Sequence, residues 1–134
     1  MKQESRKINN SNGTNHFHHE ILAWERALDF QLTENSYLKT SLALAVDTAQ
    51  DKRFLENAER YQSIFLKNDE VLKRVLTEVK QQQERMKRTY LTTNPLSERN
   101  FEMKQSELRD EVEGLEKEFS NLKREFNNYL VSTL

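Results

Sequence analysis

The chain has 134 residues, which suits one domain, with 21 Lys and Arg against 22 Asp and Glu. This near-neutral balance gives no general case for nucleic acid or an anionic membrane as a partner. The sequence holds two glycines, one proline and no cysteine. A many-stranded sheet, a barrel, disulfides and thiolate metal sites are therefore excluded, and long helices are what remains.

The first 15 residues are rich in Asn, Ser, Lys and Gln. They offer too little apolar surface to offset the entropy of ordering, so we expect residues 1–15 to be a disordered tail. They also lack the apolar core of a signal peptide. No later stretch approaches the roughly 20 apolar residues of a membrane span. We expect a soluble, cytoplasmic protein with no membrane partner.

From Ile21 onward, apolar residues recur with alternating steps of three and four, the spacing of a heptad repeat. The repeat predicts an all-α fold, an antiparallel up-down-up three-helix bundle over 16–134 with coiled-coil heptad packing. The predicted helices lie at about 17–49, 52–89 and 96–131. Their seams begin with Ile21, Trp24 and Leu28, with Phe54, Ala58 and Tyr61, and with Phe101, Gln105 and Leu108.

The three seams can be aligned because residues paired between antiparallel helices have numbers with a constant sum. A sum of 103 for the first two helices places Asn35 opposite Asn68, and a sum of 187 for the last two adds Phe119 to that layer. A buried Asn pair in a heptad seam fixes register at some cost in stability. The alternative is a polar ligand site beside Phe119.

The two connections differ in how clearly they are marked. Asn94 before Pro95 indicates a helix stop followed by a new start. Residues 46–53 contain neither Gly nor Pro, although Thr48 or Asp51 could cap a second helix there. A closed hairpin is the prediction. The alternative is one continuous helix, giving an extended rod or a domain-swapped dimer.

The chain's three histidines lie together, as His16, His18 and His19, followed by Glu20. His16 and Glu20 are four residues apart and would share a helix face, which is a spacing of metal ligands. A weakly bound divalent transition metal is one interpretation, and a polar helix start capped by Thr14 or Asn15 is the other. We expect no other cofactor, and no catalytic motif is present, so we expect no enzymatic activity.

Some apolar residues fall outside the predicted seams. Phe30, Tyr37 and Leu44 are spaced by seven on the first helix, and Leu66 lies at the height of Tyr37 on the second. They could widen the core. Left exposed, they would form a surface for a homodimer or another protein partner.

The segment from His16 to Leu42, with its His-His-Glu run and Trp24, resembles an uncharacterised group of short bacterial helical proteins. Their third helix resembles LEKEFSNLKREFNNYL at 115–130. The resemblance implies a helical protein and brings no known activity with it. The sequence as a whole predicts a non-enzymatic interaction or structural module that self-associates or binds a protein partner through its first helix. Metal binding at the histidine cluster is the alternative.

Overall fold

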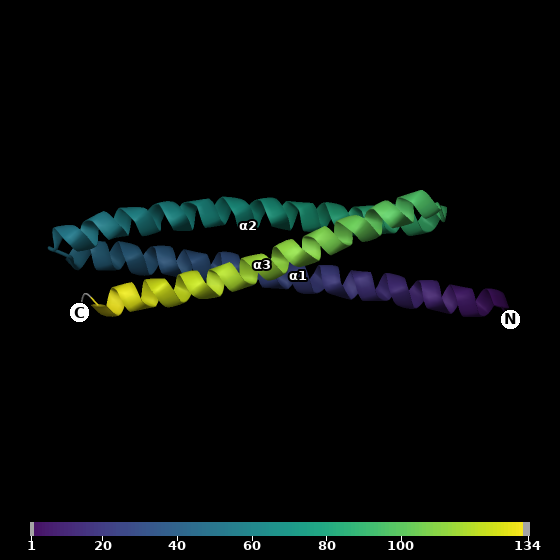
Figure 1. Ribbon diagram of the computed structural model, residues 1–134, viewed down its shortest axis with the longest axis horizontal. Helices are drawn as coiled ribbons and strands as arrows, with labels where there is room; N and C mark the ends of the chain where they lie inside the picture. Colours follow the sequence, from purple (N-terminus) through teal and green to yellow (C-terminus); the bar gives the residue numbers. More distant parts are fainter. Residues whose placement is uncertain (1, 133–134) are drawn as a thin grey trace.

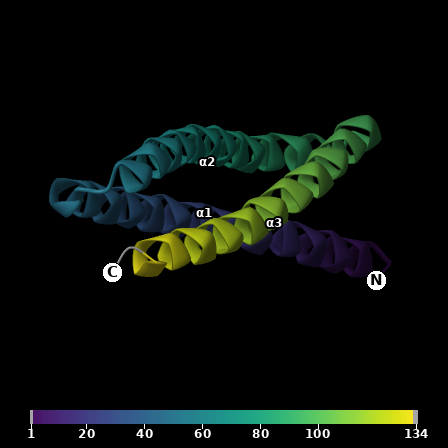
Figure 2. The ribbon, with the colours of Figure 1, turned by 60° about the vertical axis from the view of Figure 1, so that its left-hand side comes forward.

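The computed structural model describes the backbone of residues 2–132 and the side chains of residues 15–132. These residues form three long helices, α1 (Lys2–Thr48), α2 (Lys52–Thr92) and α3 (Pro95–Ser132), that run up, down and up again. In Figures 1 and 2, α3 crosses α1 obliquely and its C-terminal end lies near the α1–α2 turn. The predicted three-helix bundle is confirmed, with α1 and α2 as a closed hairpin.

Asp51, at the end of the α1–α2 turn, is the N-cap of α2. The Asp51 carboxylate accepts a hydrogen bond of 2.9 Å from the backbone N–H of Arg53, which satisfies a donor at the start of α2. Of the two predicted caps, Asp51 is therefore the one used. The Thr48 hydroxyl instead donates to the Ala45 carbonyl within α1.

The α2–α3 turn follows the predicted stop and start. Thr93 ends α2 in the left-handed conformation, with φ of 47°. The Asn94 side chain then accepts hydrogen bonds from the N–H groups of Leu96 and Ser97, at 3.0 and 3.4 Å. Pro95 is the first residue of α3, where the N–H that it lacks would have had no helical partner.

The start of α1 differs from the expectation. The helix begins at Lys2 rather than near residue 17, so the segment 2–15, predicted as a disordered tail, continues the helical backbone. No proline interrupts it, and each residue added to an existing helix gains a hydrogen bond without a new nucleation step. Figure 1 shows this end of α1 extending past the α2–α3 turn. Met1 lies outside the described residues.

The predicted seam is the core. Its positions on all three helices are buried or half-buried, and Leu28, Leu72 and Leu108 are fully inaccessible to solvent. The predicted register is confirmed where Asn68 donates to the Asn35 side-chain oxygen at 3.1 Å. The Gln82 amide donates to that of Gln105 at 3.0 Å, which obeys the register predicted for α2 and α3.

The apolar core consists of two clusters. One lies toward the α2–α3 turn and is mostly aliphatic, with Leu28, Val75 and Leu108 among its members. The other lies toward the α1–α2 turn and contains stacked or edge-on rings, including Phe65 and Phe126 at 5.0 Å between centroids. The Asn35 layer lies at the boundary between them. No helix in the described part of the chain has the length and apolar character needed to cross a membrane.

Candidate functional site

The apolar stripe predicted on α1 stays on the surface of the folded chain. Phe30, Tyr37 and Leu44 are 63%, 70% and 64% exposed. They therefore do not widen the core, although α3 lies beside Phe30 and Leu44 and lines hollows with them. Three large apolar side chains at heptad spacing on one helix face form a surface suited to contact with another helix.

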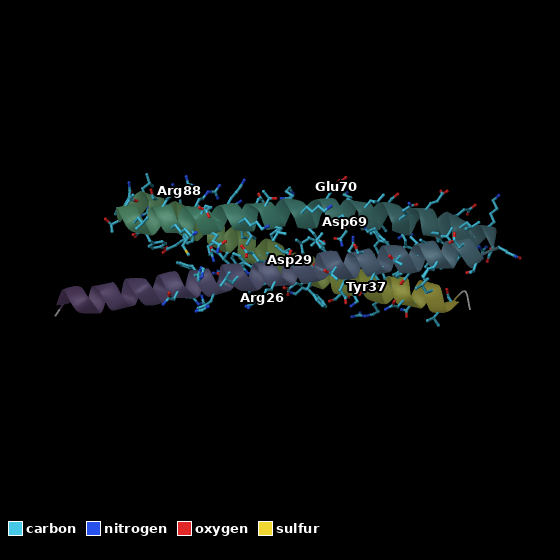
Figure 3. The ribbon with its side chains drawn as sticks, turned by 180° about the vertical axis from the view of Figure 1, so that it is seen from behind. Arg26, Asp29, Tyr37, Asp69, Glu70 and Arg88 are labelled. Carbon is cyan, nitrogen blue, oxygen red and sulfur yellow. The ribbon has the colours of Figure 1, made fainter. Side chains whose placement is uncertain are left out.

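Leu66 does not belong to this surface. It is 52% exposed and lines a groove between α1 and α2, together with Leu42, Val46 and Ala58. Figure 3 shows Tyr37 on the side of α1 away from α2, whereas Asp69 lies between the two helices. Of the four residues predicted to form one surface, Phe30, Tyr37 and Leu44 therefore lie together on α1, whereas Leu66 of α2 lies apart from them in the groove between α1 and α2.

Two hollows flank Tyr37 along the stripe. One has a volume of about 250 Å³ and the other about 670 Å³. Side chains of α3 line part of each, and the α1–α2 turn and Phe54 of α2 also line the larger one. The α1 helix contributes four residues to each at spacings of three, one and three: Ala27, Phe30, Gln31 and Glu34 to the smaller, and Ser41, Leu44, Ala45 and Thr48 to the larger. Four residues in this diamond arrangement are the receptor for one side chain of a facing helix.

Gln31 marks the smaller hollow as incompletely packed. Its side chain is only 6% exposed, yet neither its amide nitrogen nor its amide oxygen has a hydrogen-bond partner. A buried amide without partners costs free energy. Glu34, on the rim of the same hollow, forms an ion pair with Lys123 of α3. The one acidic side chain that α1 contributes to this hollow is therefore already neutralised within the chain.

The polar layer at Asn35 is more extensive than predicted. The Asn35 amide nitrogen donates to the Phe65 carbonyl at 2.9 Å and to the Asp69 carboxylate at 2.7 Å, in addition to the contact with Asn68. Asp69 also pairs with Lys39. Partial burial raises the pKa of the Asp69 carboxyl, but the hydrogen bonds from Lys39 and Asn35 and the positive charge of Lys39 outweigh it and hold that pKa below its ordinary value. The layer is internally satisfied at Asn35, as expected for a device that fixes register.

The Glu20 carboxylate, predicted beside the histidines as a metal ligand, is bound by two side chains of α3. Arg109 of α3 donates two hydrogen bonds to the Glu20 carboxylate, at 2.6 and 2.8 Å, and Gln105 donates a third at 2.9 Å. Burial raises the pKa of this carboxyl, yet the bonds from Arg109 and Gln105 prevail and keep it below the ordinary value. Glu20 therefore holds α3 against α1.

The three histidines differ in their exposure to solvent. His16 and His19 are exposed, whereas His18 is half-buried and its Nδ1 has no hydrogen-bond partner. Within the described residues, no three His, Asp or Glu side chains form a group that could hold a metal ion. Metal binding at His16, His18, His19 and Glu20 stays a prediction.

No family model, no curated protein and no solved structure matches this chain. The resemblance of residues 16–42 to short bacterial helical proteins therefore stays an expectation.

Proposed function

We propose that this protein is a non-enzymatic helical module that associates with a protein partner through α1. The observation that carries the proposal is the exposed stripe of Phe30, Tyr37 and Leu44, at heptad spacing on a helix that already uses its opposite side for the core. Exposing three large apolar side chains costs solubility, and covering them would return roughly 25 cal/mol for each Å² of apolar surface removed from water.

A helix is the partner element that fits this surface best. The stripe follows a heptad spacing, and two hollows lined by α1 and α3 lie on either side of Tyr37, where side chains of a facing helix could enter. The absence of cysteine and the near-neutral charge support a protein partner in the cytoplasm over a nucleic acid or a lipid surface.

The test is the solution mass, by light scattering at two protein concentrations, of the wild type and of a variant with Phe30→Glu, Tyr37→Glu and Leu44→Glu. We expect the wild-type mass to rise with concentration and the variant to stay monomeric, because three carboxylates cannot be buried in an apolar contact.

A matched control carries the same three charges elsewhere, as Leu91→Glu, Leu96→Glu and Met103→Glu. These side chains are also exposed, at 82%, 64% and 58%, and they lie at the α2–α3 end of the bundle. The control should associate like the wild type. Association that survives the stripe substitutions, or that the control loses equally, would contradict the proposal.

A further inference from the structure

We infer that the partner is a second copy of this chain, whose α1 packs antiparallel against α1 about a two-fold axis near Tyr37. This deepens the proposed function and rests on it. A surface that recognises itself about a two-fold axis must carry, on each side of that axis, the complement of what lies on the other side. The α1 surface has this property in its shape and in its charges.

The two hollows are related in the way that such an axis requires. Their α1 residues span 27–34 and 41–48, two heptads apart, and the midpoint between the centres of the two spans falls beside Tyr37. In an antiparallel pair centred there, Leu44 of the second copy lies over the hollow at 27–34, and Phe30 of the second copy lies over the hollow at 41–48. Each hollow therefore receives one residue of the partner's stripe.

Each hollow has room for the side chain that would enter it. The hollow over which leucine would lie has a volume of about 250 Å³, and the hollow over which phenylalanine would lie has about 670 Å³. The two Tyr37 side chains meet at the axis, and each is otherwise 70% exposed to solvent. Knobs of one helix then fill holes of the other along the whole stripe.

The α1 residues that continue the stripe at heptad spacing include a single charged residue. Alternating steps of four and three on α1 pass through Ala23, Ala27, Phe30, Glu34, Tyr37, Ser41, Leu44 and Thr48. This is a second heptad seam, distinct from the one that forms the core. Glu34 is its one charged member, and Lys123 already neutralises it. On α1 itself, a second helix can therefore cover this seam without burying an unpaired charge, while α3 adds Glu116 to the lining of the smaller hollow.

The charges beside the seam select the antiparallel orientation. Arg26 and Asp47 occupy the same heptad position beside the seam, near its two ends, and both are exposed, Asp47 at the groove between α1 and α2. Neither takes part in an ion pair with another described residue. Antiparallel packing about Tyr37 brings Arg26 of each copy to Asp47 of the other. Parallel packing would place like charges opposite each other, which disfavours association.

Single cysteines test the orientation, because the chain has none of its own. Isotope-labelled Phe30→Cys protein is mixed with unlabelled Leu44→Cys protein and treated with a short bismaleimide. Linked peptides are then identified by mass spectrometry. We expect links between positions 30 and 44, with few links of 30 to 30 or 44 to 44. The control is Leu66→Cys, 52% exposed in the groove on the other side of α1, which should not link to itself.

The charge pairs provide a second readout that does not depend on the stripe. Arg26→Asp and Asp47→Arg should each weaken the dimer about tenfold, since each change affects two symmetric pairs and creates repulsion. The combined variant should recover to within about threefold of the wild type. A combined variant no tighter than the single ones would overturn the predicted pairing.

The outcomes separate this inference from the proposed function. A dimer that is abolished by glutamates on the stripe but links 30 to 30 and 44 to 44 overturns only the antiparallel arrangement. A chain that stays monomeric at every concentration overturns the second copy as partner. A dimer that survives the glutamates overturns the stripe as the contact surface, and with it the proposed function.

Discussion

Replacing Asn35 by Ala would remove the side chain that joins α1 to α2 at the middle of the bundle. Asn35 is fully buried, and its amide makes hydrogen bonds to the Phe65 carbonyl, the Asp69 carboxylate and the Asn68 amide. A neutral hydrogen bond contributes about 0.5–1.5 kcal/mol net, and one to a charged group about 1.5–3 kcal/mol. The three together predict a loss of about 3–5 kcal/mol.

This loss is large on the scale of the whole fold, because domains of this kind are stable by only about 5–15 kcal/mol. An unfolding entropy of about 2.1 cal/mol/K per residue gives roughly 0.3 kcal/mol/K for a chain of this length, so the Tm should fall by about 10–18 °C. Thermal and urea unfolding followed by circular dichroism measure it. Both proteins must be compared at one concentration, since association shifts the apparent stability.

The matched control is Asn57→Ala. The Asn57 amide donates to the Arg53 carbonyl one turn earlier, at 3.2 Å, but on the exposed face of α2. The same atoms are removed, and Ala is a better helix former than Asn. Asn57→Ala should therefore change the free energy of unfolding by no more than about 0.5 kcal/mol. If Asn35→Ala lies within about 1 kcal/mol of this control, the buried layer does not hold the hairpin as argued.

Two further predictions concern the end of the bundle near Glu20. Folding lowers the pKa of the Glu20 carboxyl from its ordinary value of 4.5. Glu20 therefore stabilises the fold at pH values above 4.5, and this stabilisation is lost as the pH falls through the lower pKa of the folded state. Urea unfolding across this range should show a steeper acid loss in the wild type than in Arg109→Ala, and equal slopes would refute the assignment. Separately, Gln82→Leu and Gln105→Leu should each cost about 1–3 kcal/mol, because each removes the buried hydrogen bond between the two amides together with the bond that the lost amide makes to the Phe101 carbonyl or to Glu20. The double variant should cost less than the sum of the two; strict additivity in a double-mutant cycle would count against the pair.

The sequence predicted the seam and the register because both depend on spacing along the chain. A heptad repeat determines which residues face inward, and one constant sum determines the height at which helices meet. The spacing alone therefore pairs Asn35 with Asn68, and the structure shows the hydrogen bond between them. Height does not give position around the bundle. For this reason the spacing groups Leu66 with Tyr37, although Leu66 of α2 lines the groove between α1 and α2. Tyr37 lies on the side of α1 away from α2.

The partners of surface charges were harder to predict. Arg109 is one of 21 basic residues, and nothing in its own neighbourhood of the sequence indicates Glu20. The offset between α1 and α3 that follows from the two sums places Glu20 near Gln105, so that pair was within reach. The Asp69 contact with Asn35 had a weaker signal, since a charged residue next to a seam position is usually solvated.

The division of the core at Asn35 has a consequence for how the bundle opens. Each half is built from separate apolar contacts, and only the helical backbones run through both. Backbone amides in the aromatic half can thus exchange with solvent by separation of the ends near the α1–α2 turn, while the aliphatic half stays closed. The three helices would then contain two units that open separately, and the protection of backbone amides against hydrogen exchange would change at the Asn35 layer.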